Sequence, residues 1–304
     1  MMLSVLYFIC FGLSYIAVRL YRQTILNSLP ALIRKREDQL PIANGAGSAL
    51  WDVSLLFSIY LILYQNASLH RMLFLLLATL SFMLLGWVDD WLELKPKTKF
   101  LFQTGLALVL VPLYFRINGF GMGIAGQMLC ILLLVWLVNA INFFDILDGA
   151  ATSVTVLILM TLAFLFKKQG MDIHSRLSLF WSVSLFGFLI QNVYKPSVFL
   201  GDAGAHLLGS VLFFLSLDFF CQSDLTRVHA ASILAALFGF IIFDFSYVCL
   251  RRIMKKIPPF MKSGDHLMFI VLKYTRSRYA VLMIFIFFQT IACVLAWNFF
   301  VLKQ

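Results

Sequence analysis

The chain has 304 residues, of which 62% are hydrophobic and only 12% are charged, whereas soluble domains carry about 25% charged residues. This composition and a mean hydropathy of +0.93 exclude a soluble enzyme and predict an all-α, polytopic membrane protein. The net charge of +10 is compatible with nucleic-acid binding, but in a membrane protein excess Lys and Arg more often marks the cytoplasmic loops.

Ten apolar runs are long enough, or nearly so, to cross about 30 Å of hydrocarbon as helices. Lone open strands are excluded because their backbone groups would lack partners in lipid. We therefore predict a single transmembrane domain over residues 1–304, with spans at approximately Met2–Leu20, Ala46–Tyr64, Met72–Val88, Phe100–Phe115, Ile124–Val138, Gly149–Phe166, Leu177–Val193, Ala203–Cys221, Ala230–Leu250 and Tyr279–Phe300.

Ten spans divide the loops into two sets and place both termini on one side of the membrane. Most of the 24 Lys and Arg residues fall in one set of loops, between residues 19 and 36, 95 and 99, at 195, and between 251 and 278. The positive-inside rule puts this set in the cytoplasm and both termini outside it. The basic residues then reflect topology, and no nucleic-acid partner is predicted.

The second cytoplasmic loop follows an apolar run that ends in paired acids, Asp89 and Asp90, with Glu93 and the lysines Lys95, Lys97 and Lys99 after them. If the helix continues, Glu93 shares a face with the acid pair. A solvated helix end would explain one acid. Two adjacent acids with three lysines instead indicate a site that holds a cation and a phosphate together.

The third cytoplasmic loop has no basic residue, although it faces the basic side. Its amides and acids, Asn139, Asn142, Asp145 and Asp148, recur at three-residue spacing among Phe, Ile and Leu. Polar side chains in such surroundings usually coordinate something. Buried polar contacts between helices are the alternative.

The fourth cytoplasmic loop places Asp202 between Gly201 and Gly204 at the start of an apolar run. The glycines would let a ligand approach the backbone, and a helix N-terminus favours anionic groups. Asp202 as a helix N-cap is an equally good interpretation. His206, one turn further on, is expected to be a packed polar residue.

The fifth cytoplasmic loop, Arg251–Arg278, combines basic residues, which often contact lipid head groups, with a Gly264-Asp265-His266 string that resembles a tight turn presenting an imidazole. Three acids lie inside spans, namely Asp52, Asp218 and Asp244. Asp218 is expected near a solvated outer end, and Asp244 either pairs with Arg251 two turns on or has a functional role. Across the cytoplasmic loops, hard oxygen ligands without a Cys/His cluster favour magnesium or manganese over zinc.

The motifs VDDWLELKPKTKFLFQ, NAINFFDILDG and VFLGDAGAHLLG together resemble the polyprenyl-phosphate N-acetylhexosamine-1-phosphate transferase superfamily, or glycosyltransferase family 4. The resemblance implies a Mg²⁺-dependent transfer of a sugar 1-phosphate, most often N-acetylglucosamine 1-phosphate, from a UDP-sugar to undecaprenyl phosphate with release of UMP. It also implies a bacterial inner-membrane location, periplasmic termini, a cytoplasmic active site and a role in starting a surface glycan such as O-antigen. The implied partners are undecaprenyl phosphate, a UDP-sugar and the bilayer, with a homodimer as a further option.

The resemblance also assigns roles by position. Asp89 and Asp90 match the catalytic acid pair, while Asp202 and Asn142 match metal ligands. Asp148, Phe199 and Asp145 would bind the nucleotide, Phe199 by stacking on uracil. Phosphate or other substrate groups would be bound by Lys99, Lys97 and His266.

The chain departs from the family at His266-Leu-Met-Phe269, which keeps one histidine of the usual run. That departure argues against the alternative donor, phospho-N-acetylmuramoyl-pentapeptide, which would make lipid I. A transporter is the second alternative, although its ionisable groups would be expected near the bilayer midplane. A catalytically silent family member is the third.

Overall fold

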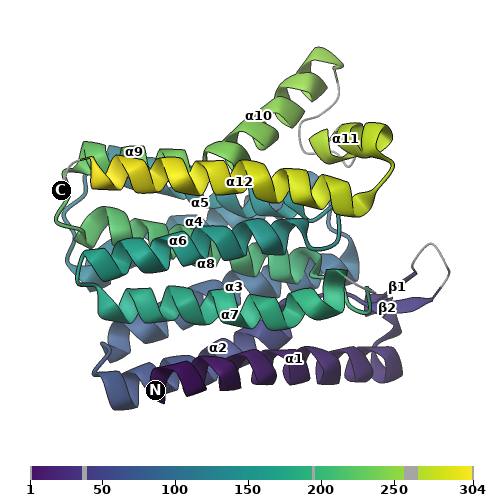
Figure 1. Cartoon of the computed structure of the whole chain (residues 1–304), viewed down its shortest axis with the longest axis horizontal. Helices are drawn as coiled ribbons and strands as arrows, with labels where there is room; N and C mark the ends of the chain where they lie inside the picture. The colour runs from purple at the N-terminus through teal and green to yellow at the C-terminus, as the bar shows by residue number, and fades with distance from the viewer. Residues whose placement is uncertain (1, 36–39, 194–195, 257–265, 303–304) are drawn as a thin grey trace.

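The computed structural model describes residues 2–35, 40–193, 196–256 and 266–302. Long helices run side by side through most of the molecule (Figure 1). Their bounds are α1 Met2–Ser28, α2 Gly47–Gln65, α3 Leu69–Leu92, α4 Pro96–Asn118, α5 Ile124–Phe144, α6 Ala150–Lys168, α7 Asp172–Val193, α8 Gly201–Gln222, α9 Arg227–Leu237, α10 Gly239–Met254, α11 Leu267–Thr275 and α12 Arg278–Val301.

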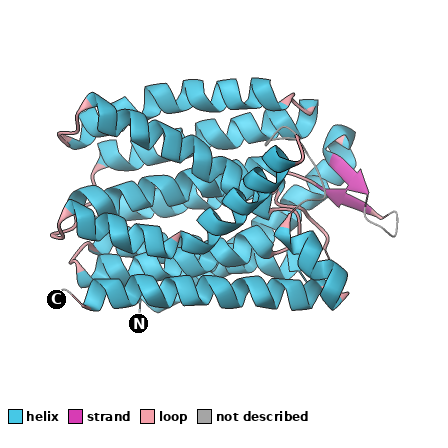
Figure 2. Cartoon of the chain, turned by 90° about the horizontal axis from the view of Figure 1, so that it is seen from above, coloured by secondary structure: helices cyan, strands magenta, loops and turns pink. Residues whose placement is uncertain are grey.

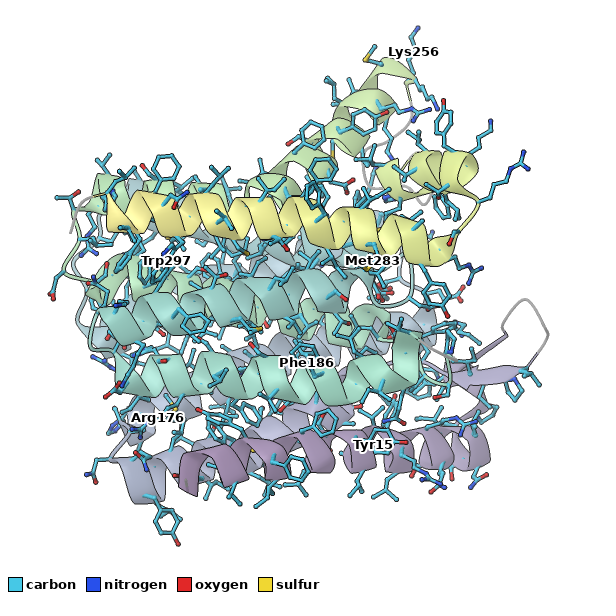
Figure 3. The ribbon with its side chains drawn as sticks, in the orientation of Figure 1. Tyr15, Arg176, Phe186, Lys256, Met283 and Trp297 are labelled. Carbon is cyan, nitrogen blue, oxygen red and sulfur yellow. The ribbon has the colours of Figure 1, made fainter. Side chains whose placement is uncertain are left out.

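Within the described ranges, nine helices are long and apolar enough to cross a membrane, and α9 with α10 gives a tenth if both parts form one span. Apolar side chains such as Phe186 and Met283 lie on the outer surface of the bundle (Figure 3). The prediction of an all-α polytopic membrane protein is confirmed.

The predicted span Ala230–Leu250 is not one continuous helix, because α9 and α10 meet at an angle of 65°. The backbone at Phe238 has φ −91° and ψ 1°, which ends α9, and α10 then leaves the bundle (Figure 1). Hydropathy is averaged over a window, so it cannot reveal a break at a single residue between two apolar segments.

Helix α8 is buried along almost its whole length and packs against α2, α3, α5 and α6. Two glycines permit this close packing. A Cβ on Gly86 of α3 would lie 2.3 Å from the carbonyl oxygen of Asp202, and one on Gly47 of α2 would lie 2.6 Å from Cα of Gly204. The start of α8 is therefore held directly against two neighbouring backbones.

A short antiparallel hairpin, β1 Ile33–Lys35 and β2 Pro41–Ala43, lies at one end of the bundle (Figure 2). Its second strand also pairs with the segment before α8, because the Phe199 N–H donates to the Ala43 carbonyl at 2.8 Å. The start of α1 and the end of α12 lie at the opposite end (Figure 1). We call these the hairpin end and the terminal end.

Candidate active site

Asp90 lies in the last turn of α3 and its side chain is only 3% exposed. Its carboxylate accepts hydrogen bonds from the backbone N–H groups of Asp202, at 3.0 Å, and Ala203, at 2.9 Å. Asn44 donates to the same carboxylate at 2.7 Å. These N–H groups belong to the first turn of α8, which has no partners for them within the helix. Asp90 thus caps α8 from another helix and fixes the position of Asp202.

Asp89 has different partners although it is the adjacent residue. One carboxylate oxygen accepts from the backbone N–H of Leu94 at 2.8 Å, and the other lies 2.7 Å from Nζ of Lys99. Lys99 begins the second turn of α4 and also forms an ion pair with Asp202. Its ammonium group therefore joins the ends of α3 and α8.

Asp202 completes the cluster. One of its carboxylate oxygens, Oδ1, accepts from both the Lys99 ammonium and the Asn142 side-chain amide. About a fifth of the Asp202 side chain is exposed, compared with 7% of that of Asp89. Side chains from α3, α4, α5 and α8 thus meet at the hairpin end, with Asp202 the most accessible acid. The N-cap alternative for Asp202 is wrong, because Asp202 lies within α8.

The oxygen donors of this cluster fit Mg²⁺. In the described part of the chain, no three His, Cys, Asp or Glu side chains are arranged to hold a metal alone, as a zinc site would require. Magnesium usually binds through one or two carboxylates and completes its shell with water and substrate phosphates. Asp202 and the amide oxygen of Asn142 could serve as its protein ligands, and the Lys99 ammonium shows that the site between Asp202 and Asp89 attracts a cation.

The nucleotide candidates lie around the same cluster. Asp145 follows the last residue of α5, and burial raises the pKa of its carboxyl well above the ordinary value. The charges of Asp202, Asp148 and Asp90 raise that pKa further. Asp148 lies 3.9 Å from the Arg278 guanidinium. Phe199 is half-buried and pairs through its backbone with the hairpin segment.

The three residues expected to bind phosphate or other substrate groups do not lie together. Lys99 lies within the cluster, whereas Lys97 is exposed. His266 is buried and precedes α11, with its ring 2.9 Å from the Arg252 guanidinium. Arg252 also lies over the Phe143 ring, 5.0 Å from its centre. The Ser263–Asp265 part of the predicted turn is outside the described residues.

Other expectations need correction. Glu93 does not share a face with the acid pair, because α3 ends at Leu92 and the Glu93 backbone turns left-handed, with φ 50°. Its exposed side chain instead contacts Arg34 at 3.3 Å. The close approach that Gly201 permits is by protein, since a Cβ there would lie 2.7 Å from Oδ2 of Asp90.

A buried polar chain lies beneath the cluster. Asn139 donates to Gln103 at 2.6 Å, and the Gln103 amide nitrogen lies 3.1 Å from Nε2 of His206. His206 is fully buried, which confirms that it is a packed polar residue. Asn139 therefore faces away from the acids that we expected it to accompany.

Comparison with known proteins shows a similarity to one family. Residues 72–220, which carry all of the clustered acids, match the model described as glycosyl transferase family 4. Over these residues the chain is similar to this family.

The proteins to which the chain is similar carry two kinds of name. The chain is 31% identical over 206 residues to a "probable undecaprenyl-phosphate N-acetylglucosaminyl 1-phosphate transferase" of Bacillus subtilis (strain 168), covering 65% of this chain and 57% of the relative. It is 31% identical to a phospho-N-acetylmuramoyl-pentapeptide-transferase of Synechococcus sp. (strain JA-2-3B'a(2-13)), covering 46% of each. A protein of that same name from Staphylococcus carnosus (strain TM300) is 27% identical over 55% of this chain and 59% of its own length. The chain thus spans about half the length of the curated relatives it matches.

Two residues that the sequence did not predict contact the cluster or its neighbours. Asn44 lies in the stretch 40–47, which carries no acid or base, so only its contact with Asp90 reveals it. Arg252 lies in a basic run that lipid contact explains, but it is fully buried. The available signal was the position of Arg252, which lies next to an apolar run and fourteen residues before His266.

Proposed function

We propose that this protein transfers an N-acetylhexosamine 1-phosphate from a UDP-sugar to undecaprenyl phosphate and releases UMP. The observation that carries the proposal is the meeting of Asp89, Lys99 and Asp202, from three helices, at one end of a membrane-spanning bundle. A lipid phosphate and a soluble nucleotide both carry negative charge, so their reaction needs cationic groups placed at such a boundary.

Each clustered side chain has a proposed task. Asp202 and Asn142 hold Mg²⁺, which neutralises charge on the phosphates when it is bound. Lys99 binds a phosphate oxygen and, by its link to Asp89, orients that acid toward the substrate. Asp145, Asp148 and Phe199 bind the uridine, while Lys97 and His266 contact the donor beyond it, with Arg252 holding His266 in place.

The two adjacent acids divide the catalytic work. Asp90 uses both carboxylate oxygens to hold α8 and Asn44, so we assign it a positioning role. Asp89 is the acid that meets the acceptor phosphate. That phosphate is largely ionised near neutral pH, since its second pKa is about 6, as in phosphoserine. Asp89 therefore acts mainly by placing Lys99 and the acceptor.

The setting of the reaction follows from the charge distribution of the loops. The hairpin end, with the cluster, faces the cytoplasm of a bacterial cell, and the terminal end faces the periplasm. UDP-N-acetylglucosamine is the proposed donor, and the product starts a surface glycan such as O-antigen.

A direct assay tests the proposal. Purified protein is incubated with undecaprenyl phosphate, Mg²⁺ and a panel of UDP-N-acetylhexosamines, and UMP is measured. We expect UMP release that requires the lipid, stops on chelation of Mg²⁺, and falls at least about a hundredfold in Asp202→Asn, the range for removing one group that stabilises the transition state. Glu93→Gln, an exposed acid in the same loop, is the matched control and should keep full activity.

One further donor belongs in the panel. Relatives named phospho-N-acetylmuramoyl-pentapeptide-transferase make UDP-N-acetylmuramoyl-pentapeptide the second candidate. UMP release from that donor alone would assign lipid I synthesis instead. Folded protein that releases no UMP from any donor would refute the transferase proposal, and substrate flux in proteoliposomes without UMP would favour a transporter.

A further inference from the structure

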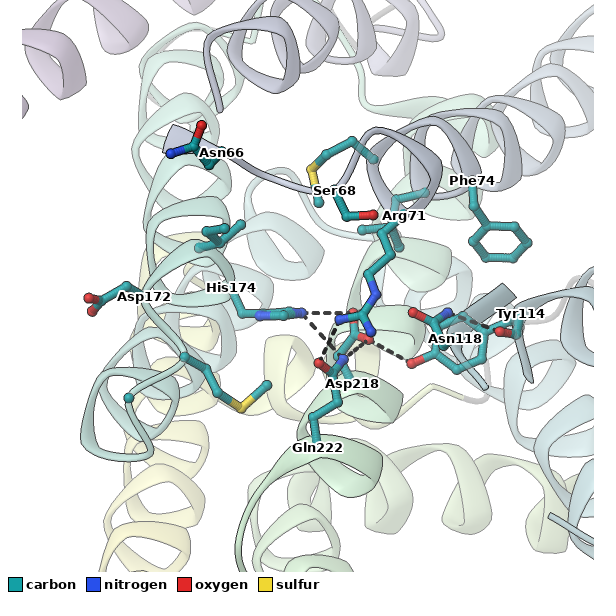
Figure 4. Close-up of a pocket in the computed structure, with 15 residues that line it drawn as sticks. Asn66, Ser68, Arg71, Phe74, Tyr114, Asn118, Asp172, His174, Asp218 and Gln222 are labelled. Atoms are coloured by element: carbon teal, nitrogen blue, oxygen red, sulfur yellow. Dashed lines mark hydrogen bonds and ion pairs between the residues drawn. The ribbon is translucent and has the colours of Figure 1, made fainter. Parts of the chain in front are cut away.

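A cavity of about 450 Å³ lies at the terminal end of the bundle, away from the acid cluster. The α2–α3 turn, the end of α4, the α6–α7 turn and the end of α8 line it (Figure 4). Its volume is within the range of about 300–1,000 Å³ found for small-molecule sites. Polar side chains converge on it, and their contacts indicate what it can hold.

Asp218 is the centre of the polar group. It is only 3% exposed, so the expectation that it is solvated is wrong. One carboxylate oxygen, Oδ1, accepts from the Tyr114 hydroxyl and from the Gln222 amide, each at 2.6 Å. The Arg71 guanidinium donates to the carbonyl oxygen of Gln222 at 3.0 Å. These contacts fix Asp218 and Arg71 on the same side of the cavity (Figure 4).

Hydrogen-bonding capacity remains in this group. The second oxygen of Asp218 lies 3.6 Å from Nε2 of His174, which is longer than a normal hydrogen bond. The buried side-chain oxygen of Asn118 has no hydrogen-bond partner among the described residues. Only one N–H of Arg71 has a partner in that part of the chain. Two acceptors and several donors are thus available together.

We infer that this cavity binds an uncharged, hydroxyl-rich ligand of the sugar class. A hydroxyl both donates and accepts, so such a ligand can satisfy the oxygens of Asn118 and Asp218 and the N–H groups of Arg71 at once. A fully deprotonated anion has no hydrogen to donate to those oxygens, and any anion would lie beside the Asp218 carboxylate and be repelled by its charge. A metal cation would lie beside Arg71. A buried acceptor left without a donor costs about 1–3 kcal/mol.

Asp172, the second acid on the cavity wall, does not add an unpaired negative charge to that of Asp218. Asp172 forms its own ion pair with Lys167, at 2.6 Å, and its carboxylate points away from Asp218 (Figure 4). The site also lies about 24 Å from Asp202 along α8, at 1.5 Å per residue. Its ligand is therefore bound independently of the proposed transfer reaction.

The test measures binding to the purified full-length protein, not turnover. Isothermal titration calorimetry is carried out with methyl glucoside as the neutral probe and with inorganic phosphate as the anionic probe. Nanodiscs that contain diglucosyl-diacylglycerol, compared with phosphatidylglycerol alone, show whether a lipid head group rather than a free sugar is the source of the hydroxyls. The variants are Asp218→Asn, Arg71→Gln and Asn118→Ala, with Asp172→Asn as the matched control.

We expect methyl glucoside or the glucolipid to bind, and its affinity to fall at least tenfold in Arg71→Gln and Asp218→Asn but not in Asp172→Asn. Asn118→Ala gives the same answer if Asp218→Asn fails to fold. Tighter binding of phosphate, binding unaffected by all three site variants, or no binding of any probe would each overturn the inference. UMP release by Arg71→Gln should equal that of the wild type.

Discussion

Helix α8 has an acid near each end, and the two acids are stabilised by different groups. Asp202, at the hairpin end, is held by the Lys99 ammonium and an amide. Asp218, at the terminal end, is held by the Tyr114 hydroxyl and an amide at normal distances. The first set of partners balances the charge of Asp202, while the second mainly satisfies the hydrogen bonds of Asp218.

This difference separates two kinds of chemistry within one helix. At the hairpin end, an ammonium group lies between carboxylates. A divalent cation can bind in the same position, and such a cation assists phosphate transfer. A carboxylate surrounded by hydroxyl and amide donors suits neutral ligands that exchange hydrogen bonds. Substitutions at each end test whether the two ends really differ.

Removing the ammonium group should expose the charge repulsion at the hairpin end. In Lys99→Met, Asp89 and Asp202 lose their shared cation, and the free energy of unfolding should fall by about 3–5 kcal/mol, as when one partner of a buried ion pair is removed. Thermal unfolding in detergent measures this, with and without Mg²⁺. We expect Mg²⁺ to restore more stability to Lys99→Met than to the wild type. Equal Mg²⁺ effects on both proteins would contradict a cation site between these acids.

Loosening Asp90 should impair catalysis without removing a group that contacts substrate. Asn44→Ala removes the donor 2.7 Å from the Asp90 carboxylate, and we expect kcat for UMP release to fall about 10–100-fold, the range for groups that orient metal ligands. KM for the donor should change much less. If KM rises while kcat stays constant, Asn44 contacts substrate instead. Asn66→Ala, an amide at the terminal end, is the control.

Disturbing the terminal end should affect stability but not turnover. Tyr114→Phe removes the hydroxyl that donates to Asp218, and the free energy of unfolding should fall by about 1–3 kcal/mol because a buried acceptor loses its partner. UMP release per folded molecule should stay unchanged. A large loss of turnover in Tyr114→Phe would show that the two ends are coupled.

A pH-dependent stability difference should appear at Asp145. Its pKa is raised in the folded protein by burial, so the protonated acid favours folding at low pH. That contribution is lost as pH rises above the ordinary carboxyl value of about 3.9 and through the raised pKa. Asp145→Asn should therefore increase the melting temperature at pH 7.5 and have little effect near pH 4. An increase of the same size at both pH values would exclude ionisation of Asp145 as the cause.

The sequence predicts the convergence of Asp89, Lys99, Asn142 and Asp202 because alternating spans bring their loops to one side, and charge and amide patterns mark them. It could not separate the roles of Asp89 and Asp90. That difference arises from backbone N–H groups of a helix more than a hundred positions away in the chain.

Other errors have local causes. Glu93 was placed on the acid face because nothing in its residue type indicates a left-handed backbone. The bend after α9 escaped detection because both segments are apolar. Asp218 was expected in solvent because burial near a helix end depends on which side chains surround it, and Tyr114 and His174 come from distant parts of the chain.

Gly86 has no functional group, yet it sets the distance between the two helices that carry Asp89 and Asp202. Only a hydrogen atom fits between its Cα and the carbonyl oxygen of Asp202, so the spacing of α3 and α8 sets how far Asp89 lies from Asp202. A methyl group added at position 86 would push α3 and α8 apart and widen that spacing, although no acid, amide or lysine of the site would be replaced. A substitution at Gly86 is therefore expected to reduce activity although this residue has no reactive side chain.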